Sequence, residues 1–144
     1  MLPEFDEFGL LPPGVHRTTR EEFEQRFVRF ARSDRRFQVY NGLRRLLEDA
    51  AKSEFVKRVI VAGSFVTEKD EPNDFDCLLL LDGAAVDREL RPLDYNLVSR
   101  RAARARYGGD VVAVVERTAA ELQLFDFFQT TRDGRRMGVV EVEQ

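Results

Sequence analysis

Two aspartates separated by one residue, Asp74 and Asp76, are the side chains in this chain best suited to chemistry. They come at the start of an apolar run, residues 77–81, which is typical of a buried strand. Because side chains alternate between the two faces of a strand, we expect both carboxylates on the same face. Such a pair repels itself unless a cation compensates the charge, and Mg²⁺ prefers hard oxygen ligands. The pair therefore predicts a metal site.

A glycine and a serine, Gly63 and Ser64, supply a complementary feature directly after the apolar run 59–62. Glycine lets the backbone approach a ligand closely, and the amides after it, with the serine hydroxyl, can donate to phosphate oxygens. Lys69, in the charged connection to the second apolar run, is a further candidate phosphate ligand; the alternative is a solvated loop lysine. Residues 56–82 thus predict a strand, a phosphate-binding turn and a second strand.

A third carboxylate has two candidates, because the apolar run 111–115 is bracketed by Asp110 and Glu116. The alternation of a strand places both acids on one face. They lie at opposite ends of the strand, roughly 20 Å apart, so at most one of them can share a site with Asp74 and Asp76.

Gly63-Ser64 followed after nine residues by Asp74-x-Asp76 resembles the signature of the DNA polymerase β-like nucleotidyltransferase superfamily, and especially its minimal, single-domain bacterial members. Three wider segments also resemble a family of short bacterial nucleotidyltransferase-like proteins. These are residues 11–16, 63–69 and 126–129. The similarity covers nearly the whole chain.

The resemblance implies transfer of a nucleoside monophosphate from an NTP, with ATP as the expected donor, to a protein or RNA acceptor. It implies two Mg²⁺ ions held by Asp74, Asp76 and a third carboxylate, for which the family pattern favours Asp110. It also suggests a toxin–antitoxin or phage-defence pair in which a partner protein presents the acceptor. The alternative is a non-catalytic nucleotidyltransferase-like module that binds a partner.

Several helices should surround these strands. Phe23, Phe27 and Phe30 recur at helical spacing after a capping-box pattern, which predicts a first helix. Residues 35–52 predict a second, amphipathic helix. A third is expected near residues 94–107, and a last one follows Thr118 and precedes a final strand over residues 138–142. We expect a small α/β domain, with a mixed sheet of about four strands, helices on one face and the acids near one end of the other.

Residues 1–144 are expected to form a single domain in which residues 1–17, rich in proline and glycine, form an extended N-terminal arm. His16 in this arm is interpreted as a structural residue. Cys77, the only cysteine, lies inside an apolar run and should be a small buried side chain.

Four arginines cluster on the expected third helix. They are Arg100, Arg101, Arg104 and Arg106. This cluster is either a solvated surface or a face that binds an acceptor or nucleic acid. The net charge of −3 argues against a general nucleic-acid binder, because such binding depends on neutralising phosphates. With neither a signal-like N-terminus nor an apolar run of transmembrane length, the expected location is the cytoplasm.

Overall fold

A computed structural model describes residues 1–29 and 33–144 of the chain. Phe30, expected on the first helix, lies outside the described residues. The elements are, in chain order, β1 (Gly14–Thr18), α1 (Arg20–Phe27), α2 (Arg35–Lys52), β2 (Val56–Ala62), the 3₁₀ helix η1 (Gly63–Val66), β3 (Asp76–Leu81), the 3₁₀ helix η2 (Gly83–Asp87), α3 (Pro92–Val98), α4 (Arg100–Tyr107), β4 (Asp110–Val115), α5 (Ala119–Phe128) and β5 (Gly138–Val142).

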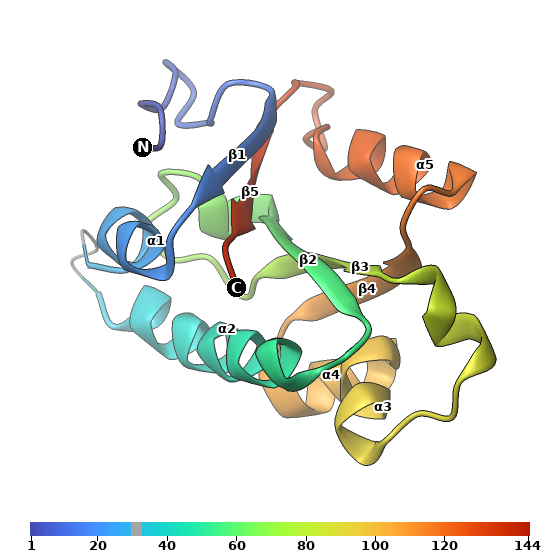
Figure 1. The fold of residues 1–144 in the computed structure, drawn as a ribbon. Coiled ribbons are helices and arrows are strands. Elements are labelled where there is room, and N and C mark those ends of the chain that lie inside the picture. The colour runs from blue at the N-terminus through green and yellow to red at the C-terminus, as the bar shows by residue number, and fades with distance from the viewer. Residues whose placement is uncertain (30–32) are drawn as a thin grey trace.

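The strands form one mixed sheet in the order β1-β5-β2-β3-β4 (Figure 1). The outer pairs, β1 with β5 and β3 with β4, are parallel, while β2 is antiparallel to both of its neighbours. The expected mixed α/β architecture is confirmed. The described sheet has five strands rather than about four, because Gly14–Thr18, of which all but Thr18 was expected in the extended arm of residues 1–17, pairs with β5.

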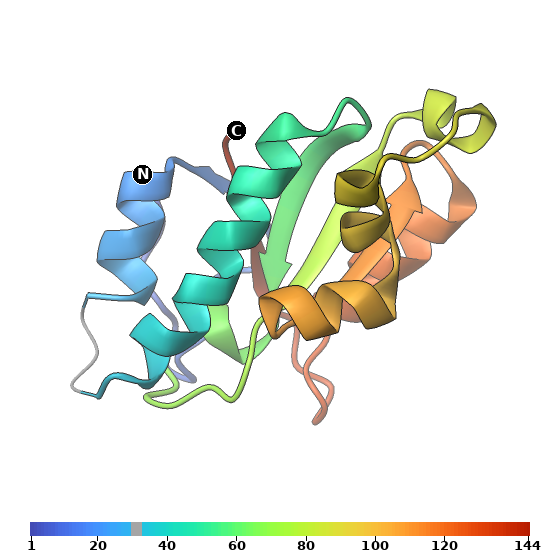
Figure 2. The same ribbon diagram turned by 90° about the horizontal axis from the view of Figure 1, so that it is seen from below.

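Helices α1 to α4 cover one face of the sheet (Figure 2). Phe23 and Phe27 of α1 are fully buried in the core of this face, as their spacing predicted, and so is Cys77 of β3. The prediction of a single helix near residues 94–107 is wrong. The chain forms two helices there, because Ser99 leaves the helical conformation and its hydroxyl accepts a hydrogen bond from the Ala102 amide at the start of α4.

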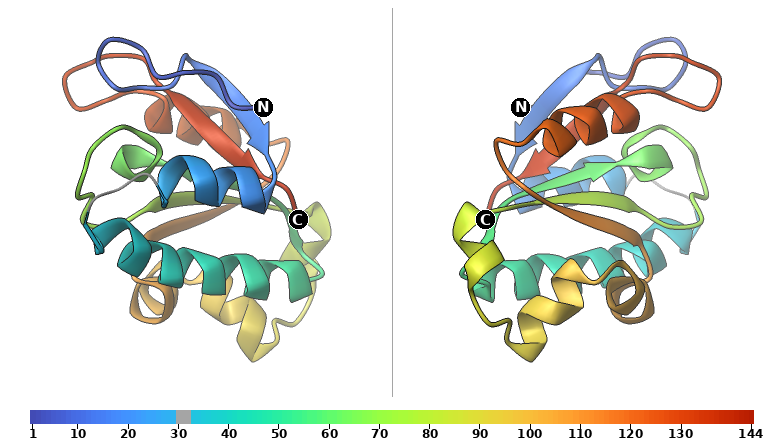
Figure 3. Two further views of the ribbon diagram at one scale, coloured as in Figure 1. Left: turned by 90° about the vertical axis from the view of Figure 1, so that its left-hand side faces the viewer. Right: turned by 90° about the vertical axis from the view of Figure 1, so that its right-hand side faces the viewer.

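Helix α5 covers the second face of the sheet and lies on the side opposite α2 (Figure 3). A second apolar cluster joins it to the strands. It contains Ile60, Ala62, Leu78, Leu80 and Val139, with Val112, Val114, Leu124, Phe125 and Phe128 packed against them. The expectation that helices lie on one face thus describes α1 to α4, and α5 adds a partial second layer.

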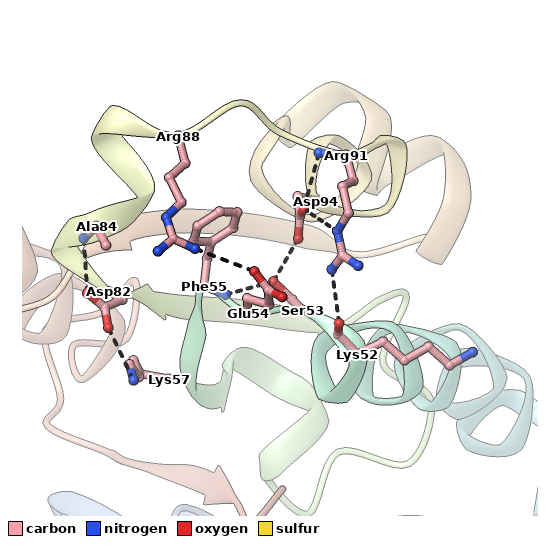
Figure 4. Close-up of polar contacts among 10 residues, drawn as sticks. All are labelled: Lys52, Ser53, Glu54, Phe55, Lys57, Asp82, Ala84, Arg88, Arg91 and Asp94. Carbon is pink, nitrogen blue, oxygen red and sulfur yellow. Dashed lines mark hydrogen bonds and ion pairs between the residues drawn. The ribbon is translucent and has the colours of Figure 1, made fainter.

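Polar contacts at one end of the sheet tie the end of α2 to the start of α3 (Figure 4). The buried Asp94 carboxylate accepts hydrogen bonds from the Ser53 hydroxyl at 2.8 Å and from the Arg91 amide at 3.2 Å. The Arg91 guanidinium in turn donates to the Lys52 carbonyl at 3.0 Å. Since α4 begins two residues after α3 ends, these contacts help to fix α4 beside the sheet.

Helix α4 is also fixed by close packing against α2. The carboxylate of Asp49 on α2 accepts hydrogen bonds from the Tyr107 hydroxyl at 2.6 Å and from Arg106 Nε at 2.9 Å. Gly42 lies against the Tyr107 carbonyl so closely that a Cβ there would come within 1.9 Å of the oxygen. The position of α4, which carries the arginine cluster, is therefore set by α2.

No helix within residues 1–29 and 33–144 is long and apolar enough to cross a membrane.

Candidate active site

Six of the residues that the sequence singled out as site candidates lie together along one open cleft of about 810 Å³. They are Gly63, Ser64, Lys69, Asp74, Asp76 and Asp110. They come from the turn after β2, the connection to β3 and the first residues of β3 and β4. The cleft volume lies within the range of roughly 300–1,000 Å³ found for small-molecule sites.

Asp76 and Asp110 are neighbours because β3 and β4 are parallel and in register. They are Cα partners at the first position of their strands, followed along the same face by Leu78 and Val112. This face lies opposite α1 to α4, as expected for the acids, and α5 covers part of it. Asp74 precedes the first residue of β3, so the alternation expected from the sequence does not apply to it. Its side chain nevertheless faces the same cleft.

Of the three carboxyl groups, that of Asp76 has the least favourable environment for a negative charge. Burial, followed by the negative charges of Asp74 and Asp110, raises its pKa from the ordinary 3.8 to about 6. Arg104 and Arg100 oppose this shift without cancelling it. The floor of the cleft around Asp76 is therefore a place where additional positive charge would be favourable.

Gly63 shapes the wall of the cleft beside Asp76. Its φ is +76°, in the left-handed region, and a Cβ built on it would lie 2.0 Å from Asp76 Oδ2. Only glycine fits this position without displacing the carboxylate. The turn and the acid are thus in direct contact, which the sequence suggested only through their spacing.

A buried arginine, Arg36 at the start of α2, holds the segment that follows Gly63. Its guanidinium is fully buried and donates hydrogen bonds to backbone carbonyls of this segment. The acceptors are Phe65 at 2.6 Å, Thr67 at 2.7 Å and Lys69 at 2.6 Å. A further bond reaches the Phe27 carbonyl at 2.9 Å. Burial lowers the pKa of Arg36 to about 10. Arg36 therefore fixes the backbone on which Ser64 and Lys69 lie.

Two arginines of α4 bind the acids. Arg100 forms a two-pronged ion pair with Asp110, in which Nε and Nη2 each lie 2.7 Å from a different carboxylate oxygen. Arg104 Nη1 lies 2.7 Å from Asp74 Oδ2. The hydrogen bonds from Arg100 hold the pKa of Asp110 below its ordinary value. The sequence predicted either a solvated face or an acceptor-binding face here, and neither alternative included these partners.

Glu116, the alternative third acid, lies at the other end of β4. Its amide donates to the carbonyl of Leu81, the last residue of β3, whereas Asp110 pairs with the first. Among the described residues that line the cleft, Asp110 is present and Glu116 is not. The structure therefore separates Glu116 from Asp74 and Asp76.

Residues 3–143 match the model of a family of unknown function, DUF6932. The chain belongs to this family. No curated protein matches it, and no solved structure does.

The donors in this DUF6932 cleft suit a hard cation, since they are carboxylate oxygens and a hydroxyl. The arrangement of the side chains is less favourable. Over residues 1–29 and 33–144, no group of three His, Cys, Asp or Glu side chains is placed to hold a metal ion. Both oxygens of Asp110 and one of Asp74 are bound by arginine. Metal binding would therefore require these ion pairs to open.

Aromatic side chains of α5 also line the DUF6932 cleft. Phe127 and Phe128 of α5 both line it, with ring centroids 5.4 Å apart in an edge-to-face arrangement. Phe127 is 70% exposed, so its ring is available to a ligand. Gln129, in the same segment, accepts a hydrogen bond from the Gly14 amide at 2.8 Å and thereby ties the end of α5 to β1.

Proposed function

We propose that this chain is a metal-dependent nucleotidyltransferase that moves a nucleoside monophosphate from an NTP, with ATP as the first candidate, to a protein or RNA acceptor. The acceptor hydroxyl attacks the α-phosphorus, and pyrophosphate leaves. One observation carries the proposal. The glycine-serine turn, Lys69 and the acids Asp74, Asp76 and Asp110 line a single cleft large enough for a nucleotide. The resemblance of these residues to the polymerase β-like signature points to the same chemistry.

In this proposal Asp74, Asp76 and Asp110 would hold Mg²⁺, which supplies a lowered pKa for the acceptor hydroxyl and charge compensation for the triphosphate. Ser64 and the amides of η1 would bind the β and γ phosphates. Arg36 contributes indirectly, because its hydrogen bonds keep the backbone of this segment in place. Asp110 is the candidate to receive the proton of the acceptor hydroxyl.

The base of the nucleotide has a suitable surface in the same cleft. Aromatic side chains stack on nucleobases with little sequence preference, and each stacked base is worth about 1–3 kcal/mol. Phe127 presents an exposed ring on the wall formed by α5. In a toxin–antitoxin or phage-defence pair, a partner protein would then present the acceptor.

Calorimetric titration with ATP and the other NTPs, with and without Mg²⁺, tests the proposal. The wild-type protein should bind at least one NTP in a magnesium-dependent manner, and an Asp74→Ala, Asp76→Ala double variant should lose this binding. Glu116→Ala is the matched control, because it removes an acid at the other end of β4. It should leave binding unchanged. Folded wild-type protein that binds no NTP would exclude the stand-alone enzyme.

A non-catalytic partner-binding module is the second candidate, and two observations favour it. Asp74 and Asp110 are already neutralised by Arg104 and Arg100. Helix α5 also leaves Leu122 72% exposed and Phe127 70% exposed, so two large apolar side chains of this helix are available to a partner. If the double aspartate variant and the wild type show the same behaviour with every NTP, this candidate becomes the better account.

A further inference from the structure

The ion pair between Arg100 and Asp110 occupies a carboxylate that the proposed function needs for metal. Both oxygens of Asp110 accept hydrogen bonds from Arg100, at 2.7 Å each. A two-pronged arginine pair uses the same lone pairs that a cation would use. Asp110 can therefore bind Arg100 or a divalent cation at full strength, but not both.

Arg100 can leave this pair without disturbing the core. Its side chain is 69% exposed and lies on the surface of α4, at the first residue of the helix. It also lines the cleft, together with Lys69 and Arg132 on other segments. The planar guanidinium fits a phosphate group by the same two-pronged geometry that it uses with a carboxylate. A phosphate in the cleft is thus an alternative partner within its reach.

We infer that Arg100 exchanges partners: it neutralises Asp110 in the ligand-free cleft and binds a phosphate of the nucleotide once Asp110 turns to the metal. The inference rests on the proposed function and adds to it the residue that couples metal binding to nucleotide binding. Without nucleotide, the metal competes with Arg100 for Asp110. With nucleotide, Arg100 has a new anionic partner and the competition ends. Each ligand therefore strengthens the binding of the other.

The experiment compares wild type with Arg100→Gln, and uses Arg101→Gln as the control. Arg101 is the next residue on the same helix and is exposed, so its replacement makes the same change in net charge. The affinity for Mn²⁺ alone is determined from the concentration of free Mn²⁺, which is measured by electron paramagnetic resonance. The affinity for ATP is measured by calorimetry at saturating Mg²⁺. Thermal melting verifies that all three proteins are folded.

Arg100→Gln is expected to change the two affinities in opposite directions. Mn²⁺ alone should bind about tenfold more tightly and ATP about tenfold more weakly, because one charged two-pronged contact is removed from each competing state. Arg101→Gln should change both affinities by less than about twofold, as a screened surface charge does. A merely structural role of Arg100 would weaken both ligands together.

Two results overturn the inference, and they differ in what they say about the proposed function. If Arg100→Gln binds Mn²⁺ no more tightly than Arg101→Gln, or keeps wild-type affinity for ATP, Arg100 does not exchange partners, and the nucleotidyltransferase proposal stands. If none of the three proteins binds Mn²⁺ or ATP, both proposals fail.

Discussion

Gly63, the first residue of η1, and Asp76, the first residue of β3, are in contact: a Cβ on Gly63 would lie 2.0 Å from Asp76 Oδ2. The backbone of the turn and the most buried acid of the cleft therefore determine each other's positions. This contact explains why a residue with a φ of +76° and no side chain stands directly before Ser64. Any side chain at position 63 would have to move the carboxylate.

Gly63→Ala should destabilise the protein by about 2–3 kcal/mol, because it combines left-handed backbone strain with a clash against a buried group. The matched control is Gly134→Ala. Gly134 has a φ of +86°, and a Cβ there would meet no atom within 4 Å. This control should cost only about 1 kcal/mol, from backbone strain alone. Urea denaturation measures both. Equal losses would show that the contact with Asp76 carries no energy.

Asp76→Asn should stabilise the metal-free protein at alkaline pH. The pKa of Asp76 is raised to about 6 in the folded state, so folding favours the protonated carboxyl. The stability that the protonated Asp76 carboxyl contributes is fully present below the unfolded pKa near 3.8. It is lost as the pH rises through about 6. At pH 8 the variant should therefore exceed wild type by about 1–2 kcal/mol after solvent screening, and the difference should vanish near pH 4. Unfolding in EDTA-containing buffers from pH 4 to 8 measures this.

Asp110→Asn should change the stability of the protein in the opposite direction to Asp76→Asn. The hydrogen bonds from Arg100 lower the pKa of Asp110 in the folded state, so the ion pair stabilises the fold above the unfolded pKa. This stabilisation is lost as the pH falls through the lowered pKa of the folded state. This variant should be less stable than wild type at pH 8, by up to about 1 kcal/mol for a pair with an exposed arginine. If both aspartate variants shift stability in the same direction at pH 8, the electrostatic description of the cleft is wrong.

Arg36→Met should destabilise the protein by about 3–5 kcal/mol, because it leaves several buried backbone carbonyls without a donor. Arg35→Met is the matched control, since Arg35 is the preceding residue on α2 and is exposed. It should change stability by less than about 0.5 kcal/mol. Chemical denaturation with circular dichroism compares the two. A loss at Arg36 no larger than that at Arg35 would contradict a role in holding residues 64–69.

Local sequence patterns were sufficient to predict much of the fold. Helix α2 occupies residues 35–52 as predicted, and β5 occupies residues 138–142. An amphipathic apolar stripe marks α2, and a short, mostly apolar run after a turn marks β5. Strand β1 was missed because it is an edge strand whose only strand partner among the described residues is β5, so its pairing depends on contacts distant in sequence. The break at Ser99 was missed because the apolar spacing continues across it, although a serine at that position is a good helix cap.

The site could be predicted in part for a related reason. Gly63, Ser64 and the acids are each next to an apolar run, and the ends of strands meet at one edge of a sheet. Arg36 carries no such signal, because arginine on a helix is usually solvated. Arg100 was part of a predicted cluster, but the cluster did not predict Asp110 as its partner. Their roles depend on which carbonyl or carboxylate the fold brings near, and only the structure contains that information. The catalytic role of the acids stays a prediction.

The position of α4 leads to a last prediction, at Gly42 in the middle of α2. Replacing a helical glycine with alanine normally stabilises a protein by roughly 0.5–1 kcal/mol. Here the new Cβ would come within 1.9 Å of the Tyr107 carbonyl oxygen, a backbone atom that cannot rotate away. Gly42→Ala should therefore destabilise the protein, by about 2 kcal/mol or more.

The helices α2 and α4 must separate to admit this methyl group, which would also displace Arg100 and Arg104 from Asp110 and Asp74. Gly83→Ala is the control, because a Cβ on Gly83 meets nothing within 4 Å and its φ lies outside the left-handed region. It should be neutral or slightly stabilising. Thermal unfolding compares the stabilities, and the Mn²⁺ titration compares the sites. If Gly42→Ala proves as stable as Gly83→Ala, the close packing of α2 on α4 does not hold the arginines against the acids.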